Sequence, residues 1–111
     1  METEIKQIEL NIEAAKEFIE LGSLLEKLEQ NRAFKKLVIE GYFKDEAVRL
    51  VHALSHPSCQ SAELQVAITT DLKAIGSFQQ YLQRLHSQAQ AAKAAIEEDE
   101  RELETIRSES L

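Results

Sequence analysis

The C-terminal part of this 111-residue chain carries a heptad pattern of apolar residues. Positions that alternate in steps of three and four keep one stripe of a helix directed at a partner helix. The stripe, which we call the C-terminal seam, consists of Leu64, Ile68, Asp71, Ile75, Phe78, Leu82, Leu85, Ala89, Ala92, Ile96, Asp99, Leu103 and Ile106. A helix over this span would be about 65 Å long, and a single helix cannot cover its own stripe. The pattern therefore predicts a long helix that packs against another helix.

A matching pattern occupies the N-terminal residues, at Ile5, Ile8, Ile12, Ala15 and Ile19, and it resumes one helical face over at Leu21, Leu25 and Leu28. Gly22 lies at this shift, and glycine inside a helix costs about 1 kcal/mol relative to alanine, so we expect a packing reason for it. The simplest pairing is antiparallel, with Ile5–Leu28 against Leu82–Ile106. Small residues that permit close approach would then meet in the middle. They are Ala14 and Ala15 on one helix and Ala89, Ala91, Ala92, Ala94 and Ala95 on the other.

Helix-breaking residues in the middle of the chain predict the boundaries. Gly41 suits a helix end, because glycine adopts a left-handed conformation readily. Pro57 disfavours helical conformation at His56, and Ser58 suits the cap of the last helix. The chain is thus predicted to hold a long helix over 1–40, a short helix over 45–55, a long helix over 58–107 and a frayed tail over 108–111.

The predicted fold class is all-α. We expect two long antiparallel helices, a helical hairpin or coiled coil, with a short helix between them in a single domain over 1–111. A parallel self-associated dimer is the alternative for the same seams. Asp71 and Asp99 are the polar positions of the C-terminal seam, where such residues often set register or oligomeric state. Lys6 or Lys16 of the opposite helix could reach Asp99.

Charge and composition restrict the function classes. The formal net charge is −7, and the acidic residues dominate the flanks while the middle, 32–56, is mildly basic. Such a rod would repel nucleic acid along most of its length. One cysteine excludes an intramolecular disulfide framework and suits a reducing cytoplasm. The N-terminal residues lack a secretory signal, and no apolar run approaches the ~20 residues of a membrane span, so we expect an intracellular or virion protein without membrane contact.

Catalytic chemistry has weak support in the sequence. His52, His56 and Cys59 have a spacing that could gather zinc ligands, but a fourth ligand is missing and Pro57 redirects the chain between them. No phosphate-binding glycine loop, carboxylate pair or nucleophile triad is recognisable. We therefore expect no metal, no cofactor and no enzymatic activity.

The basic middle of the chain is the candidate partner-binding surface. It combines cationic and aromatic side chains, namely Arg32, Phe34, Lys35, Lys36, Tyr42, Phe43, Lys44 and Arg49. Two interpretations remain open. The aromatic rings pack internally while the cations are solvated, or the whole set docks an acidic partner protein; nucleic-acid binding by stacking is disfavoured. The acidic run Glu97–Glu100 is a solvated helix face, a DNA-mimicking surface or a contact for a basic partner.

Three stretches, Leu28–Phe43, Glu46–Val51 and Asp71–Gly76, carry a resemblance to a known family. Across residues 5–107 the chain resembles a family of small acidic helical proteins encoded by tailed bacteriophages. The resemblance implies a setting in the host bacterial cytoplasm or the virion. The role of such proteins is unassigned, with a link of some members to head or virion assembly. It transfers no catalytic or binding residue.

These observations lead to a first hypothesis: a non-enzymatic bacteriophage assembly or virion-associated protein that acts through protein–protein contacts. It would self-associate as a homo-oligomer or bind a phage structural protein. The alternative is a small acidic phage effector that binds and inhibits or redirects a host enzyme. A prefoldin-like chaperone subunit would share the two-helix rod, but the middle segment has a helical pattern where that family has β-hairpins.

Overall fold

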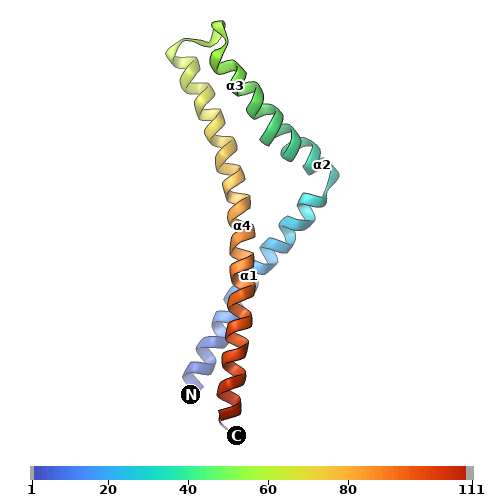
Figure 1. Ribbon diagram of the computed structural model, residues 1–111, viewed down its shortest axis with the longest axis vertical. Helices are drawn as coiled ribbons and strands as arrows, with labels where there is room; N and C mark the ends of the chain where they lie inside the picture. The colour runs from blue at the N-terminus through green and yellow to red at the C-terminus, as the bar shows by residue number, and fades with distance from the viewer. Residues whose placement is uncertain (1, 110–111) are drawn as a thin grey trace. The chain divides into compact units, whose positions relative to one another are not determined.

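The computed structural model describes residues 2–109, and these form helices joined by short connections, without a strand (Figure 1). The elements in chain order are α1 (Glu2–Gln30), α2 (Arg32–Phe34), the π-helix η1 (Lys35–Glu46), α3 (Ala47–Ser55), the 3-10 helix η2 (Pro57–Cys59) and α4 (Ala62–Glu109). The prediction of an all-α protein is confirmed. Across the described residues, no helix combines the length and the apolar character needed to cross a membrane.

Contacts divide the chain into two compact units. Unit 1 comprises Met1–Glu26 with Arg84–Leu111, and unit 2 comprises Lys27–Gln83. The helices α1 and α4 each contribute one segment to both units. The expectation that the chain forms a single domain stays a prediction.

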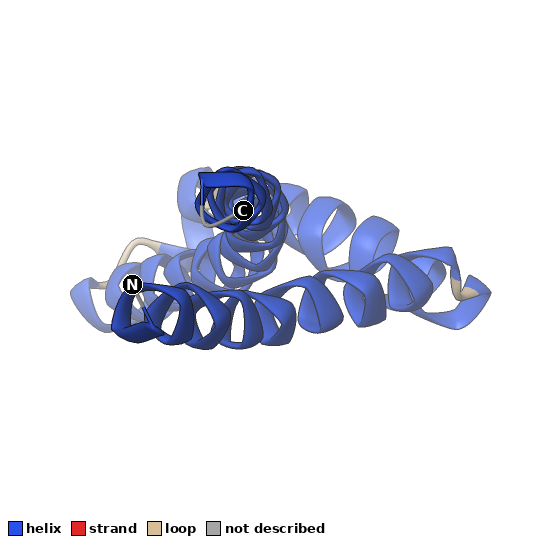
Figure 2. Ribbon diagram, turned by 90° about the horizontal axis from the view of Figure 1, so that it is seen from below, coloured by secondary structure: helices blue, strands red, loops and turns tan. Residues whose placement is uncertain are grey.

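Unit 1 is a pair of helix segments with an apolar seam. Ile8 and Ile12 of α1 are buried together with Leu103 of α4, and Ile5, Ile96 and Ile106 pack around them. Farther along α1, Gly22 faces Ala89 of α4. Residue numbers rise along α1 as they fall along α4, so the two segments are antiparallel; Figures 1 and 2 show them beside each other. This core is built from the heptad positions that the sequence marks in both segments.

Unit 2 has its own core. Leu50 of α3 is buried with Ile68 and Ile75 of α4. The half-buried side chains around these three are Tyr42, Phe43, Ala47, Ala53, Leu54, Cys59 and Leu72. The middle segment therefore packs on the first part of α4, as amphipathic helices do when each buries one apolar face.

Two glutamine side chains stabilise the turn between α3 and α4. The amide Nε2 of Gln60 donates to the carbonyls of Leu54 at 3.0 Å and His56 at 2.7 Å. Gln65 Nε2 donates to the carbonyls of Leu54 at 3.0 Å and Cys59 at 2.8 Å. Carbonyls at a helix C-terminus lack partners within the helix, so these amides take over that role.

The predicted first helix, 1–40, is wrong at its C-terminal end: α1 ends at Gln30. Asn31 has an extended backbone, with φ −68° and ψ 126°, and its side chain accepts a hydrogen bond of 3.0 Å from the backbone N–H of Phe34. Asparagine is a preferred helix N-cap because its side chain can satisfy an N–H of the first turn. Asn31 therefore ends one helix and starts the next.

The predicted helix stop at Gly41 is also wrong. Helical conformation continues from Arg32 to Ser55 through α2, η1 and α3, so the predicted short helix over 45–55 is only the last part of a longer helical run. Gly41 lies inside η1, where a Cβ would be 3.1 Å from the carbonyl oxygen of Lys36. Its missing side chain leaves room for this carbonyl in the wider turn of the π-helix.

The last helix begins later than the predicted 58–107. Pro57–Cys59 form η2, and α4 starts at Ala62. Ser61 caps it in place of Ser58, since the Oγ of Ser61 accepts from the N–H of Leu64 at 3.2 Å. The predicted frayed tail is helical through Glu109, and residues 110–111 lie outside the described part of the chain.

Candidate functional site

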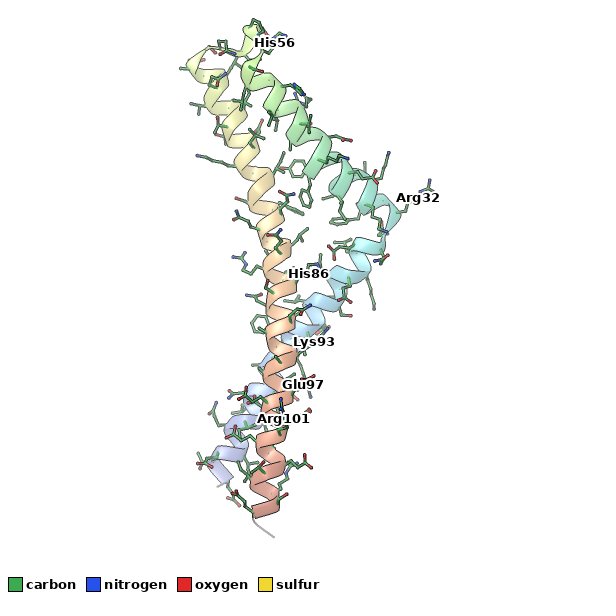
Figure 3. All side chains as sticks on the ribbon, in the orientation of Figure 1. Arg32, His56, His86, Lys93, Glu97 and Arg101 are labelled. Atoms are coloured by element: carbon green, nitrogen blue, oxygen red, sulfur yellow. The ribbon has the colours of Figure 1, made fainter. Side chains whose placement is uncertain are left out.

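The predicted partner-binding residues all belong to unit 2. Arg32 is exposed at the start of α2 and extends away from the helix (Figure 3). Lys35, Lys36 and Lys44 are exposed along η1, and Arg49 is exposed on α3. The cations are therefore solvated on the helical run 32–55.

Of the three aromatic members of the set, Phe34 is half-buried at the end of α2, and Tyr42 and Phe43 pack on the core of unit 2. Tyr42 and Phe43 are half-buried, and their ring centroids are 6.0 Å apart. Both rings contact Phe78 of α4, at 5.3 Å from Phe43 and in an edge-on arrangement at 6.4 Å from Tyr42. These separations are those of favourable aromatic pairs. Consecutive residues can both reach Phe78 because a π-helix turns less per residue than an α-helix. The rings support the packing interpretation, and a partner-binding role for the set stays a prediction.

Arg49, one of the predicted partner-binding residues, interacts with two acidic residues, Glu46 and Asp71. Its Nε donates to Glu46 Oε2 at 3.0 Å, and its Nη2 pairs with Glu46 Oε1. This two-point hydrogen bond lowers the pKa of Glu46 below its usual value and raises that of Arg49. The charge of Asp71 also contributes to the raised pKa of Arg49. The structure thus brings Asp71 of α4 toward Arg49 of α3.

The spacing predicted that Asp71 lies in the apolar seam, but Asp71 lies outside it. Asp71 is exposed, and the half-buried Leu72 takes the place between Ile68 and Ile75. Steps of four and then three suit a helical stripe as well as three and then four, so spacing alone did not separate the two. Asp99, the other polar seam residue, is half-buried in unit 1. Lys16 pairs with Glu13 at 3.0 Å instead of reaching Asp99.

The histidine–cysteine group has a structural role in the turn. The N–H of Ser58 donates to His56 Nδ1 at 3.1 Å, so the imidazole caps η2. His52 is exposed and Cys59 is half-buried against the core of unit 2. Within residues 2–109, no three His, Cys, Asp or Glu side chains are placed to hold a metal ion.

Unit 1 contains a shallow apolar groove that the sequence analysis did not identify as a site. Its volume is about 360 Å³, and it lies between the α1 and α4 segments. The lining residues are Asn11, Ala14, Ala15, Phe18, Gln88, Ala91, Ala92 and Ala95. The predicted meeting of small residues is therefore observed for Ala14, Ala15, Ala91 and Ala92, together with Ala95. Small side chains leave the floor of the groove open to a further apolar group.

Four large apolar side chains of α1 face solvent, and one of them, Phe18, lines this groove. On α1, the exposed fraction is 57% for Leu10, 41% for Phe18, 44% for Leu21 and 52% for Leu24. We call these four side chains the α1 face. Of Leu21, Leu25 and Leu28, at which the heptad pattern resumes one face over, only Leu21 belongs to the α1 face, and Leu25 is buried. An exposed apolar stripe beside a groove can bind a helix of a protein partner.

The charges of unit 1 and unit 2 differ strongly. Unit 1 holds fourteen acidic and six basic residues, for a net charge of −8, and unit 2 holds six acidic and seven basic residues, for +1. On α4, Lys93, Glu97 and Arg101 follow one another along one side of the helix (Figure 3).

No protein-family model matches the chain, and no curated protein or solved structure matches it.

Proposed function

We propose that this chain is a non-enzymatic helical assembly protein of tailed bacteriophages, or a structural protein associated with the virion, that acts through protein–protein contacts. Its working form would be a helical hairpin of two long antiparallel helices with the middle helical segment between them. The host bacterial cytoplasm or the virion would be its location.

The observation that carries the proposal is the α1 face beside the alanine-lined groove of unit 1. Four large apolar side chains there are more than two-fifths exposed. Water contact with apolar surface is unfavourable by about 25 cal/mol per Å², so four exposed apolar side chains on one helix favour a bound partner. The stripe follows helical spacing, which fits a partner helix. A phage structural protein or another copy of the chain would supply it.

The resemblance of Leu28–Phe43, Glu46–Val51 and Asp71–Gly76 to small acidic phage proteins supports the viral setting. The two antiparallel segments of unit 1 support the hairpin. An assembly protein needs interaction surfaces rather than a reaction site, and the observed side chains supply such surfaces in both units.

A second candidate function rests on the charge of unit 1. Its net −8 includes the acidic run Glu97–Glu100, of which Glu97, Glu98 and Glu100 are exposed. Such a surface attracts a basic partner over several ångströms at low salt. This favours the alternative, a small acidic phage effector that binds a host enzyme with a basic surface, such as a nuclease or polymerase.

Quantitative mass spectrometry of purified virions tests the proposal. An assembly or virion protein is expected in the particles, or in isolated capsid precursors, at many copies per particle. Absence from both, together with stoichiometric co-purification with one host enzyme from infected cells, would contradict it and favour the effector. A variant with Leu21→Gln and Leu24→Gln on the α1 face should lower the particle-bound copy number, whereas Glu97→Gln should leave it unchanged.

A further inference from the structure

A second exposed apolar surface lies on α3, in unit 2. Leu50 is only 3% exposed, whereas Val48 and Val51 are 51% and 55% exposed. These two valines are three residues apart, so they share one side of the helix. Ala47, Ala53 and Leu54 fill the side that packs on the core. Arg49, His52 and Ser55 are exposed on the rest of the helix, so the two valines extend its apolar side beyond the part that packs on the core.

The two exposed surfaces differ in shape. The α1 face borders a groove whose floor is formed by alanines, so it can accept side chains between its two helices. Val48 and Val51, which we call the α3 face, project from a single short helix. A projecting pair of branched side chains suits a groove lined by small residues. The chain therefore carries both a receiving and an inserting surface.

The charges around the two faces also differ. Glu13, Glu17 and Glu20 are exposed along the same helix as the α1 face. Lys44 and Asp45 are both exposed one turn before Val48, and Lys35 and Lys36 are exposed earlier on η1. Two α1 faces placed together would bring two units of net charge −8 into contact. An α1 face placed against an α3 face brings acidic residues to a unit of net charge +1.

We infer that the α1 face of one copy binds the α3 face of a second copy, so that the chain self-assembles head to tail. This deepens the proposed assembly function, on which it rests, by naming the partner and both surfaces. The contact joins two different surfaces, so a bound pair of copies still offers one free α1 face and one free α3 face. Repetition of such a contact gives a ring if the rotation closes and a filament if it does not.

Light scattering after size-exclusion chromatography tests the inference with the purified chain and two surface variants. The first variant, Leu21→Gln with Leu24→Gln, replaces two of the four apolar side chains of the α1 face with polar ones. The second, Val48→Gln with Val51→Gln, replaces both valines of the α3 face. All four side chains are more than two-fifths exposed, so helix content by circular dichroism should remain that of the natural sequence. We expect the natural chain to increase in mass beyond a dimer as its concentration rises.

Each variant alone should be monomeric, because every head-to-tail contact in that sample lacks one of its two faces. An equimolar mixture of the two variants should form a dimer and stop there, since one intact α1 face meets one intact α3 face. Sodium chloride from 50 to 500 mM should weaken the association, because it screens attraction between opposite charges.

Three outcomes would overturn the inference. They are a monomeric natural chain at all concentrations, a second variant that still dimerises through paired α1 faces, and a mixture that stays monomeric. This test is independent of the virion experiment. A chain that is monomeric but abundant in particles would refute head-to-tail assembly and leave the assembly function standing. A chain that self-assembles but is absent from particles would refute the assembly function and leave head-to-tail association standing.

Discussion

Gly22 of α1 and Ala89 of α4 bring the two helices of unit 1 into close backbone contact. A Cβ built on Gly22 would overlap the Cβ of Ala89, and it would lie 4.0 Å from the carbonyl oxygen of Leu85. The packing reason expected for a glycine inside this helix is therefore the facing alanine. Ala89 belongs to α4, so a side chain at residue 22 fits only if the α1 and α4 segments move apart.

Substitution of this glycine should destabilise the protein. Gly22→Ala is expected to lower the free energy of unfolding by about 1–3 kcal/mol, as overpacking of a tight contact does. Gly76→Ala is the matched control, because a Cβ there meets nothing within 4 Å. This control should raise stability by about 1 kcal/mol, through helix propensity alone. Urea unfolding followed by circular dichroism measures both, and equal shifts of the same sign would show that Gly22 is not a close-contact position.

Leu50 and Val51 are neighbours in the sequence with opposite environments, at 3% and 55% exposure. Leu50→Ala should cost about 2–5 kcal/mol, because it leaves a cavity against Ile68 and Ile75. Val51→Ala should change stability by no more than about 0.5 kcal/mol when measured at a concentration where the chain is monomeric. Thermal unfolding of both variants at low micromolar concentration checks this. A loss at Val51 as large as that at Leu50 would place both side chains in the core.

Gln65 holds two carbonyls in the turn between α3 and α4, those of Leu54 and Cys59. Gln65→Leu keeps the size of the side chain but removes both hydrogen bonds, so we expect a loss of about 1–3 kcal/mol. The exposed Gln80 on the same helix serves as the control, and Gln80→Leu should be nearly neutral. Hydrogen exchange should also become faster at the amides of α3 in the Gln65 variant alone. Unchanged protection there would refute a role for Gln65 in closing the turn.

The Glu46–Arg49 pair predicts a dependence of stability on pH. Hydrogen bonding to Arg49 lowers the pKa of Glu46 in the folded chain relative to the unfolded chain. The pair therefore contributes stability above the ordinary carboxyl pKa, and the contribution disappears as the pH falls through the lowered pKa. In an NMR titration, Arg49→Gln should raise the pKa of Glu46 toward its ordinary value. An unchanged pKa of Glu46 would contradict the assignment.

The sequence determined which residues would be helical and which of them would face a partner in unit 1. Ile8, Ile12, Ala89, Ala92 and Leu103 are buried at the heptad positions read from the chain. Spacing was sufficient there because residues 5–19 of α1 and the α4 segment each keep a regular repeat, and a regular repeat has one apolar face. The sequence also indicated a packing contact at Gly22, since a glycine inside a helix needs a compensating contact.

The boundaries in the middle of the chain depended on tertiary contacts. Asn31 interrupts a continuous helical pattern through its own side-chain hydrogen bond, whereas Gly41, the stronger signal in the sequence, stays within η1. Tyr42 and Phe43 show why, since both rings pack with Phe78 of α4, a residue far away in the sequence. That contact favours a continuous helical run beyond the glycine.

Only the tertiary structure decided which face of each helix remains free. Asp71 and Leu72 both fit the seam by spacing, and the core of unit 2 selects Leu72 and leaves Asp71 near Arg49. The exposed α1 face and α3 face likewise consist of residues that resemble core residues in the sequence. Hydrophobicity states that a side chain favours burial, but the positions of the other helices determine whether this chain alone can bury it.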